Sequence, residues 1–277
     1  MPGGTPALRI LVTGAGSGIG RAIAERLAAA GHDVTGTVRS PERVRALTEA
    51  ARQGGLRVSF VPLDLGSREA VEAAVREVLM CGPVDVLVNN AGCGLFGAVE
   101  DASAGEVARQ FEVNLLGPIQ LTRLLLPSLR ERKGRIIWIG SLAGRQSLPF
   151  QGHYAATKAG VAALSDALRM ELAPLGVQVA CVEPGDIATG FTDARVATGA
   201  ASPVYVAAAA RARSAVEREE RRAPGPDCVA RAVERLVACR RLPTRVVVGR
   251  LGRTTAVFLR LVPHSLGQRA VRLLYRA

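Results

Sequence analysis

The chain of 277 residues is poor in aromatic side chains, which make up 4% of it, and has no long apolar run. A membrane-spanning helix needs roughly 18 or more consecutive apolar residues, and no stretch of the sequence approaches that length. Residues 1–9 lack the apolar core of a signal peptide. Apolar residues still make up 48% of the chain. We therefore expect a cytoplasmic protein whose core consists mostly of Val, Leu, Ile and Ala.

Cysteine and histidine are also scarce, and their spacing matches no metal-binding pattern. The chain has three histidines and five cysteines, an odd number, with no C-x-x-C pair and no histidine beside a cysteine. A disulfide framework or a zinc site would show closer and more regular spacing. We predict free thiols in a reducing compartment, and no metal site, for Cys81, Cys93, Cys181, Cys228 and Cys239.

Only two lysines, Lys133 and Lys158, occur among the 36 basic residues, and the formal net charge is +12. Residues 240–277 alone contain nine arginines and no acidic residue. A basic surface of this kind can meet nucleic acid, anionic lipid or an acidic protein. Preferential use of arginine in a GC-rich genome explains the same charge, and we favour that explanation. We therefore expect no nucleic-acid partner.

The end of the sequence has an amphipathic pattern, with apolar residues and arginines interleaved over residues 254–262 and 265–276. A basic amphipathic segment can lie on a membrane surface, and peripheral membrane contact through it would make the protein membrane-associated. We favour the alternative that residues 250–277 are a helical extension packed on the body of the protein or on a partner subunit.

A glycine-rich turn lies between an apolar run at residues 8–12 and a helical pattern at residues 21–30. The order strand, glycine turn, helix is typical of dinucleotide-binding βαβ units, although the spacing here is G-x-x-x-G-x-G. Glycines let the backbone approach a pyrophosphate, and the start of the helix offers free N–H groups and a positive dipole. The candidate cofactor contacts in this turn are Gly14, Ser17, Gly18, Ile19 and Gly20.

The end of the second predicted strand, residues 33–38, indicates which nicotinamide cofactor is used. NAD-specific sites place an acidic residue there for the ribose 2′-hydroxyl, but this strand is followed by Arg39 and Ser40. An arginine can pair with a 2′-phosphate through two N–H groups. We predict NADP as the cofactor and consider NAD less favoured. Ser40 could instead, or in addition, be the N-cap of a helix that begins at Pro41.

The rest of the chain alternates short apolar strands with amphipathic helices, without internal repeats or a low-complexity linker. Strands are predicted over residues 8–12, 33–38, 56–61, 84–88, 135–139, 177–182 and 245–248, and helices over residues 21–30, 67–79, 104–132, 152–172 and 227–239. This order predicts an α/β fold, a Rossmann-type doubly wound parallel sheet in a single domain. We assign residues 1–249 to that domain, with a substrate lid over residues 190–224.

Tyr154 and Lys158 lie four positions apart in the helix predicted to begin near Gly152. Residues i and i+4 of a helix share a face, with their Cβ atoms roughly 6 Å apart. A free phenol has a pKa of about 10, and a fixed ammonium nearby favours the phenolate. We therefore predict that Lys158 lowers the pKa of Tyr154, so that the phenol exchanges a proton with an alcohol oxygen near neutral pH.

Taken in order, six elements resemble the short-chain dehydrogenase/reductases. They are TGAGSGIG at residues 13–20, NNAG at 89–92, Asn114, Ser141 thirteen residues before Tyr154, YAATK at 154–158 and PGDIAT at 184–189. The resemblance covers about residues 8–190. It implies an oxidoreductase that transfers hydride between a nicotinamide cofactor and a small-molecule alcohol or ketone.

The resemblance also implies roles for four catalytic residues. Tyr154 would be the general acid/base, and Lys158 would hold the nicotinamide ribose hydroxyls. Ser141 would hydrogen-bond the substrate oxygen, and Asn114 would hold a water through its unwound backbone. Further cofactor contacts are expected from Asp64, Leu65, Asn89, Ala91, Gly92, Pro184, Gly185, Ile187 and Thr189. Asp64 could instead be a helix N-cap.

A finer resemblance is to the branch that contains 17β-hydroxysteroid and retinol dehydrogenases, whose substrates are bulky and apolar. It rests on the segments at residues 92–97 and 148–150 and on Val38 with Arg39. Substrate contacts are expected from Cys93, Leu95, Phe96, Leu142, Gln146, Phe150 and Gln151. The family also implies a homo-oligomer, a dimer or tetramer, that packs through residues 104–132 and 152–173.

The leading hypothesis is thus an NADP-dependent oxidoreductase that interconverts a secondary alcohol and a ketone on a steroid-, retinoid- or polyketide-like substrate. An alternative is a 3-oxoacyl-carrier-protein-type ketoreductase, whose acidic carrier would suit the arginine-rich surface. An alternative of another class is a non-catalytic NADP-binding sensor or scaffold. The intact set of Asn114, Ser141, Tyr154 and Lys158 argues against the last, because a sensor needs no proton relay.

Overall fold

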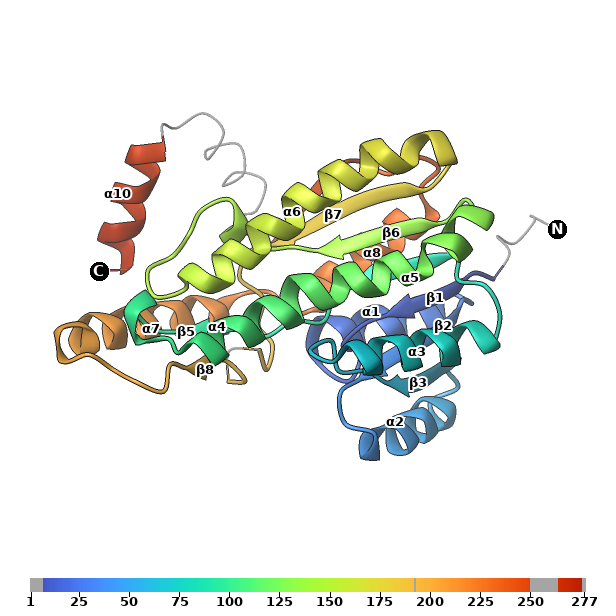
Figure 1. The fold of residues 1–277 in the computed structure, drawn as a ribbon, viewed down its shortest axis with the longest axis horizontal. Coiled ribbons are helices and arrows are strands. Elements are labelled where there is room, and N and C mark those ends of the chain that lie inside the picture. Colours follow the sequence, from blue (N-terminus) through green and yellow to red (C-terminus); the bar gives the residue numbers. More distant parts are fainter. Residues whose placement is uncertain (1–6, 192, 250–263, 276–277) are drawn as a thin grey trace.

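A sheet of seven parallel strands forms the centre of the protein (Figure 1). The structure, a computed structural model, describes residues 7–191, 193–249 and 264–275. The strands are β1 (Arg9–Val12), β2 (Asp33–Val38), β3 (Val58–Pro62), β4 (Val86–Asn89), β6 (Arg135–Ile139), β7 (Gln178–Pro184) and β9 (Arg245–Val248). All seven were expected from their apolar, largely β-branched sequences, and their ends differ from the prediction by no more than two residues.

The order of strands across the sheet is β3-β2-β1-β4-β6-β7-β9, and every neighbouring pair is parallel. The chain therefore winds outward from β1 in one direction and from β4 in the other. The order reverses between these two strands, and ligands of doubly wound sheets bind beyond the carboxyl ends of the strands at such a point. The predicted Rossmann-type sheet is confirmed, and it fixes where a site should lie.

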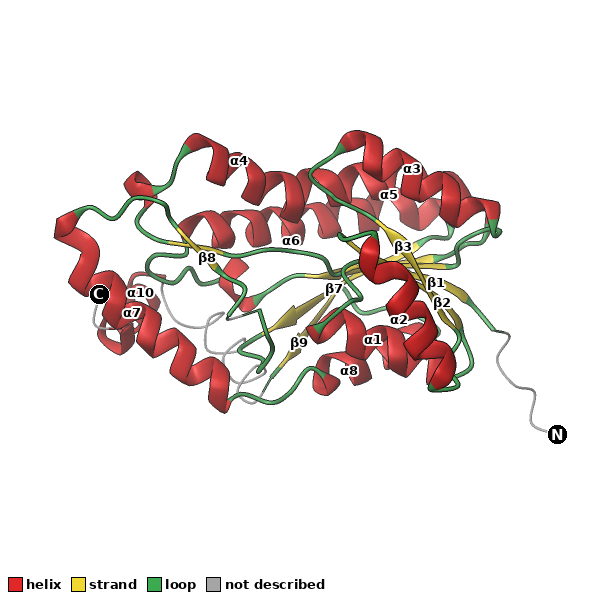
Figure 2. Ribbon diagram, turned by 90° about the horizontal axis from the view of Figure 1, so that it is seen from below, coloured by secondary structure: helices red, strands yellow, loops and turns green. Residues whose placement is uncertain are grey.

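Helices cover both faces of the sheet (Figure 2). The α-helices of the described residues are α1 (Gly18–Ala29), α2 (Glu42–Gln53), α3 (Arg68–Met80), α4 (Ala104–Phe111), α5 (Gly117–Glu131), α6 (Gly152–Leu172), α7 (Pro203–Arg222), α8 (Asp227–Ala238) and α10 (His264–Tyr275). Buried residues of α1 and α8 pack on one face of the sheet, and those of α3, α5 and α6 pack on the other. The resulting three layers have one apolar cluster on each side of the sheet.

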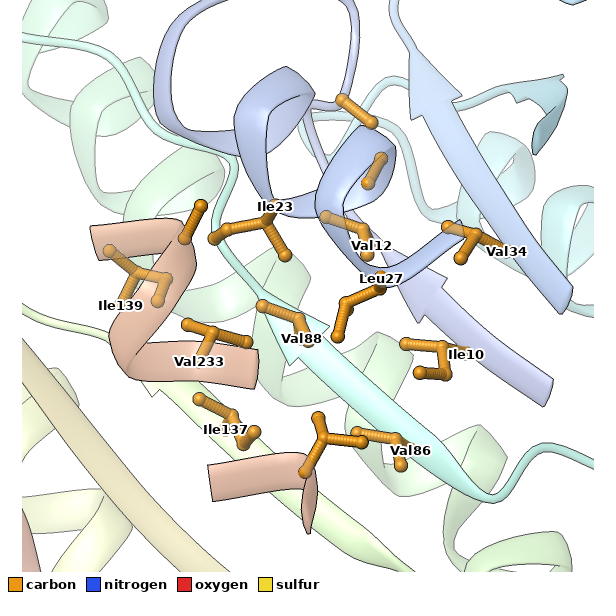
Figure 3. Packing of buried hydrophobic residues seen from close by; sticks show 14 of the residues in the cluster. Ile10, Val12, Ile23, Leu27, Val34, Val86, Val88, Ile137, Ile139 and Val233 are labelled. Carbon is orange, nitrogen blue, oxygen red and sulfur yellow. The ribbon is translucent and has the colours of Figure 1, made fainter. Parts of the chain in front are cut away.

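The apolar cluster beneath α1 and α8 fixes the position of the helix that follows the glycine turn (Figure 3). Ile23 and Leu27 of α1 are fully buried against Val12 and Val88, which lie in the two strands that flank the switch point, and Val233 of α8 closes the layer. Burying each such side chain contributes about 1.5–3 kcal/mol. The start of α1, directly after the glycine turn, is therefore anchored to the centre of the sheet.

The helix predicted over residues 104–132 is divided in the structure. A π-helical turn, η2 (Glu112–Leu116), separates α4 from α5 and contains Asn114. Asn is a weak helix former and Gly117-Pro118 follows, so the sequence allows a local kink at this position. Such π-turns are frequent at functional sites, and this one faces α6.

Two elements near the sheet's carboxyl edge escaped the sequence analysis. Strands β5 (Leu95–Phe96) and β8 (Val196–Ala197) form a second, two-stranded parallel sheet. It joins the segment after NNAG to the predicted lid. The lid itself contains α7, which lies beside α10 at the end of the molecule farthest from the N-terminus in both views (Figures 1 and 2). Strands of two residues give no periodic signal, which is why the pattern missed them.

Candidate active site

A cleft of about 1260 Å³ opens at the carboxyl edge of the sheet. Its walls come from the glycine turn, the ends of β2, β4, β6 and β7, the start of α6, the lid and one face of α10. The predicted residues that line it are Gly14, Ser17, Gly18, Ile19, Gly20, Arg39, Asp64, Leu65, Ala91, Gly92, Cys93, Ser141, Leu142, Gln146, Gln151, Tyr154, Lys158, Pro184, Gly185, Ile187 and Thr189. The fold thus brings together predicted residues separated by up to 175 positions, from Gly14 to Thr189.

The glycine turn has the conformation and the space that a close-approaching ligand needs. Gly14 and Gly18 have positive φ angles of 65° and 54°, which residues with a Cβ rarely adopt. A Cβ on Gly14 would lie 2.9 Å from the Cα of Ala91, and one on Gly20 would overlap the carbonyl oxygen of Gly14. The turn therefore needs glycine both for its backbone conformation and for its close packing. It presents the N-terminus of α1 to the cleft.

Thr13 and Asn90 fasten this turn to the end of β4. The Thr13 hydroxyl accepts hydrogen bonds from the backbone N–H groups of Asn90 and Ala91, both at 2.9 Å. The Asn90 amide donates to the carbonyl oxygen of Thr13 at 2.8 Å. Thr37 of β2 accepts from the Gly14 N–H at 3.2 Å. These hydrogen bonds make the motifs TGAGSGIG and NNAG one structural unit. The sequence analysis did not identify Thr13, Thr37 and Asn90 as the residues that hold this unit together.

The predicted cofactor contact of Asn89 does not agree with its position. Its side chain is 4% exposed and donates to the hydroxyl of Thr122 on α5 at 3.0 Å, inside the core. Side chains alternate between the two faces of a strand. The side chain of Asn89, at the end of β4, therefore points to the opposite face from that of Asn90. Asn90, not Asn89, lines the cleft.

Arg39 lies in the cleft wall at the end of β2, where the strand analysis placed it. Within the described part of the chain its guanidinium makes no hydrogen bond or ion pair, so its N–H donors are available to a ligand. Ser40 lies outside the cleft lining, and its hydroxyl hydrogen-bonds Glu42 and caps no backbone N–H. The side-chain N-cap predicted for Ser40 is therefore wrong, and its cofactor contact stays a prediction.

Asp64 lies opposite Arg39, at the end of β3. It accepts hydrogen bonds from the Gly66 N–H at 2.9 Å and from Arg109 Nη2 at 3.0 Å. Burial by itself would raise the pKa of this carboxyl, but the Gly66 N–H and the Arg109 guanidinium together lower it. Ser67, not Asp64, caps α3 by accepting from the Ala70 N–H at 3.2 Å. Asp64 is therefore a charged wall residue, and the N-cap alternative is wrong.

Tyr154 and Lys158 share a face in the first two turns of α6, as the spacing predicted. The Lys158 ammonium lies 5.8 Å from the centre of the Tyr154 ring and donates to the Ile139 carbonyl oxygen at the end of β6 at 2.9 Å. Ser141, two residues after that strand, accepts from the Ala143 N–H at 3.1 Å and so begins the short helix η3 (Leu142–Gly144). These three side chains all line the cleft.

The predicted lowering of the Tyr154 pKa is wrong. Burial raises the pKa of this phenol to about 12, although the Ser141 hydroxyl and the Arg195 guanidinium oppose the rise. Burial also lowers the pKa of Lys158 to about 8. Each group is shifted toward its neutral form because a low-dielectric environment disfavours charge. At pH 7 Tyr154 is therefore a proton donor, which suits reduction of a ketone, and Lys158 remains mostly charged.

Asn114 lies behind the cleft and is not in its lining. It is 2% exposed, accepts from the Cys93 N–H at 2.8 Å and donates to the Cys93 carbonyl at 2.9 Å and to the Thr157 hydroxyl at 3.1 Å. These bonds connect the π-turn to the segment after NNAG and to α6. The side chain of Asn114 is therefore occupied in positioning the site, and only its backbone could serve the predicted water.

The lid contributes Phe191 and Arg195, which the sequence analysis did not single out. The ring centres of Phe191 and Tyr154 are 5.8 Å apart, and the Arg195 guanidinium lies 5.6 Å from the centre of the Phe191 ring. Arg195 pairs with Glu220 near the end of α7 at 2.6 Å. The signal for these residues was only their location within the predicted lid, because nothing in the local sequence distinguishes one arginine of this segment from the others.

Only some of the residues expected to contact the substrate line the cleft. Cys93, Leu142, Gln146 and Gln151 line the cleft, whereas Leu95, Phe96 and Phe150 do not. Leu95 and Phe96 are each 5% exposed within the small sheet of β5 and β8. The Phe150 ring packs 6.0 Å from Phe96 and 6.2 Å from Tyr205 of α7. These three residues therefore lie behind the cleft lining, beside the segment predicted to be a lid, and their contact with a substrate stays a prediction.

The C-terminal helix α10 is part of the cleft wall. Gly267 and Val271 line the cleft, and Val271 packs with Leu148 against Ala215 and Val216 of α7. The helix α10 thus packs on α7 of the same chain. The amphipathic stretch at residues 254–262 lies outside the described residues. All five cysteines are free thiols, as predicted. No helix in the described residues is long and apolar enough to cross a membrane.

Comparison with known proteins identifies the family. The model of the short chain dehydrogenase family matches residues 9–199, and the chain belongs to the short-chain dehydrogenase/reductase family. This assignment makes it an NAD(P)-dependent oxidoreductase, as the site geometry indicates. The nicotinamide class of cofactor follows from the family.

Three similar proteins extend the comparison. A 3-ketodihydrosphingosine reductase of Bacteroides thetaiotaomicron is 36% identical over 271 residues, covering 96% of this chain and 97% of the relative. The crystal structure of a short-chain dehydrogenase from Streptomyces avermitilis superposes with a TM-score of 0.81 at 36% identity, over 98% of this chain and 96% of that one. The crystal structure of a single-residue variant of actinorhodin polyketide ketoreductase with NADPH has a TM-score of 0.74 at 32% identity, over 87% and 95%.

Proposed function

We propose that this protein is an NADPH-dependent reductase of a ketone on a bulky, largely apolar substrate. The observation that carries the proposal is the meeting of Tyr154, Ser141 and Lys158 in one cleft with the glycine turn and Arg39. A neutral phenol, a hydroxyl and an ammonium at the carboxyl edge of the sheet can position a ketone and protonate its oxygen.

The chain's own residues fit a nicotinamide dinucleotide. The glycine turn accepts a ligand where any Cβ would collide with Ala91 or Gly14, and it faces the start of α1. When bound, the dinucleotide supplies the hydride, which no amino-acid side chain can supply. Arg39 would pair with the 2′-phosphate that distinguishes NADP from NAD, and the solved ketoreductase with NADPH supports this choice.

Three residues of the chain would act on the substrate. The Ser141 hydroxyl would donate a hydrogen bond to the ketone oxygen, and Tyr154 would transfer its proton to that oxygen as the carbon is reduced. The charge of Lys158, held in place by the Ile139 carbonyl, would favour the phenolate that remains. Reprotonation of Tyr154 would follow from the side of the π-turn at Asn114.

Two substrate types have specific support. A long-chain lipid ketone is favoured by the similarity to a 3-ketodihydrosphingosine reductase over 96% of this chain. A carrier-bound or polycyclic polyketide is supported by the similarity to the actinorhodin ketoreductase and by the basic surface. A sensor without catalysis would have no use for the Ser141, Tyr154 and Lys158 arrangement.

The experiment is a panel of ketones incubated with purified protein and NADPH, with oxidation of the cofactor followed by absorbance. We expect turnover of long-chain or polycyclic ketones, at kcat/KM values at least tenfold above those with NADH. A panel with long-chain keto lipids in one arm and keto thioesters of a carrier protein in the other separates the two substrate types. Stable NADPH binding with no oxidation across the panel would contradict the proposal and favour a sensor.

We also propose two assembly properties from the sequence and the surface. Family resemblance supports a homo-oligomer that packs through residues 104–132 and 152–173, which contain α4, α5 and α6. Light scattering at micromolar concentration tests this property. Leu266 and Leu273 of α10 are 51% and 79% exposed beside exposed Arg269, a combination that could bind anionic lipid at the end of the molecule next to the cleft. Co-sedimentation with vesicles containing phosphatidylglycerol, compared with phosphatidylcholine alone, tests the second property.

A further inference from the structure

Arg222 is the last residue of α7, and it lines the cleft. The backbone leaves the helix at Ala223, which is extended with φ −75° and ψ 162°. The N–H of Ala188 donates to the carbonyl oxygen of Pro224 at 3.0 Å. Two residues of chain span at most about 7 Å, so the Arg222 backbone lies close to the segment that follows β7.

This segment brings the end of α7 to the glycine turn. Thr189 directly follows Ala188, and a Cβ on Gly18 would lie 3.6 Å from the Cβ of Thr189. Gly18 is the first residue of α1, and both it and Thr189 line the cleft. The hydrogen bond between Ala188 and Pro224 therefore holds the end of α7 beside the part of the cleft where α1 begins.

The start of α1 can compensate only part of the charge of a diphosphate. Its N-cap, Ser17, makes no side-chain hydrogen bond to the helix, and the first turn has no acidic residue. The N–H groups there can bind an anion, but the start of a helix acts as only about half an elementary charge. The diphosphate bridge of a dinucleotide carries two negative charges. A cation from another part of the chain would therefore strengthen its binding.

The cations in the cleft differ in whether they are already paired. Those among the described residues that line it are Arg39, Arg109, Lys158, Arg195 and Arg222. Arg109 and Arg195 pair with carboxylates, and Lys158 donates to a backbone carbonyl. Arg39 lies at the end of β2, where the 2′-phosphate is proposed to bind. Arg222 is exposed and makes no hydrogen bond or ion pair with any described residue, so its N–H donors are available to a ligand.

We infer that Arg222 binds the diphosphate bridge of the nicotinamide dinucleotide from the end of α7, together with the N–H groups at the start of α1. The planar guanidinium suits this role because it can donate to two phosphate oxygens at once. The inference rests on the proposed function and extends it to a second cofactor-binding arginine. Bound dinucleotide would then hold the end of the 190–224 segment at the glycine turn.

The test measures the dissociation constants of NADPH and NADH by fluorescence titration, with no ketone present. Arg222→Met removes the charge and keeps an unbranched side chain. It should weaken the binding of both dinucleotides by the same factor, about tenfold, the contribution of one hydrogen bond to a charged group. Arg39→Asp should instead change the ratio between the two. Arg222→Lys should stay within about threefold of the wild type, because an ammonium also binds phosphate.

Arg221→Met is the matched control. Arg221 is the neighbouring residue on α7, but it pairs with Asp193 at 3.5 Å and does not line the cleft. This variant should bind both dinucleotides within about twofold of the wild type. Adenosine 2′-monophosphate, which lacks the diphosphate bridge, should bind to Arg222→Met as it binds to the wild type. Both arginines are exposed, so the free variants should melt at the temperature of the wild type.

The outcomes distinguish this inference from the proposed function. Unchanged affinity for both dinucleotides in Arg222→Met, or an equal loss in Arg221→Met, would refute the role of Arg222 while the reductase remained. A loss confined to NADPH would place Arg222 at the 2′-phosphate and would also overturn the inference. Weaker binding of adenosine 2′-monophosphate to Arg222→Met, or a lower melting temperature of the free variant, would indicate a distorted site and refute it too. If the wild type bound neither dinucleotide, the proposed function itself would fail and this inference with it.

Discussion

Arg195 Nη2 and Glu220 Oε1 lie 2.6 Å apart, in an ion pair whose side chains are only 6% and 13% exposed. Arg195 precedes β8, and Glu220 is near the end of α7, so the pair joins the two ends of the lid. The Arg195 guanidinium also lies over the Phe191 ring, which in turn contacts Tyr154. A continuous row of contacts therefore connects this ion pair with the Tyr154 ring.

The ion pair should be strongly coupled in a double-mutant cycle. Arg195→Met leaves the Glu220 carboxylate in a poorly solvated place, and we expect a loss of about 2–4 kcal/mol in the free energy of unfolding. Glu220→Gln should cost a similar amount, whereas the double variant should cost less than the sum. Urea denaturation measures all three variants. Strict additivity would show that the two charges do not stabilise each other in solution.

Replacing Tyr154 by Phe removes the proton donor and leaves the ring that packs against Phe191. We expect kcat for ketone reduction to fall by about a hundredfold to ten-thousandfold, the usual contribution of a general acid, with NADPH affinity nearly unchanged. Stopped-flow turnover and a fluorescence titration with NADPH measure the two quantities. Tyr205→Phe is the control, because this ring packs against Phe150 behind the cleft and should keep activity within about twofold.

The lowered pKa of Lys158 predicts how NADPH binding depends on pH. Burial brings this pKa from 10.5 to about 8, so the ammonium loses its charge as the pH rises through about 8. A neutral amine is a weaker donor to ribose hydroxyls, and NADPH affinity should therefore decrease above that pH. Lys158→Gln should bind weakly and show no such step. A flat pH profile of the wild-type dissociation constant would contradict the assignment.

The same shift predicts a change in stability. Between about pH 8 and 10.5 the unfolded chain binds a proton at Lys158 that the folded chain has lost, so this residue makes the free energy of unfolding rise with pH in that window. Below about pH 8 the folded protein instead carries a buried charge. We expect Lys158→Met to stabilise the protein at pH 7 by about 1 kcal/mol or more, while abolishing reduction. Thermal melts at pH 7 and 9 measure the difference.

Arg39 should determine the choice between NADPH and NADH. Arg39→Asp replaces a guanidinium in the cleft wall by a carboxylate that repels a 2′-phosphate and accepts bonds from a 2′-hydroxyl. We expect the ratio of kcat/KM for NADPH to that for NADH to fall at least a hundredfold. Arg45→Asp is the matched control, because Arg45 is exposed on α2 outside the cleft. An equal fall in both variants would indicate a general effect of net charge.

Glu183 should be a structural residue despite its place at the end of β7. Its side chain is 1% exposed and pairs with Arg145, after the Ser141 loop, and with Arg245 of β9 at 3.0 Å. Glu183→Gln leaves Arg145 without its carboxylate partner and Arg245 with Asp166 alone, and we expect a loss of about 2–4 kcal/mol in the free energy of unfolding. Glu77→Gln on the exposed face of α3 should change it by less than about 0.5 kcal/mol.

Local sequence determined the strands, the glycine turn and the helical register of Tyr154 and Lys158. Each depends on short-range physics: apolar runs that bury between two helix layers, glycines where positive φ is required, and a repeat of 3.6 residues that aligns positions four apart. The order of these elements also predicted the parallel sheet, because its crossovers have only one common hand. The position of Arg39 in the cleft wall was predicted for the same reason, because the end of each strand has a defined position in this fold.

The tertiary structure decided the direction of several side chains, which the local sequence pattern does not determine. Asn89 and Asn90 are identical in type, and only the pleat of β4 sends one into the core and the other to the glycine turn. Phe96 and Phe150 resemble substrate contacts in sequence, but the pairing of β5 with β8 turns them to the back of the lid. The direction of the Tyr154 pKa shift was decided by burial, which depends on the packing of distant segments around the phenol and outweighs the opposing effects of Ser141 and Arg195.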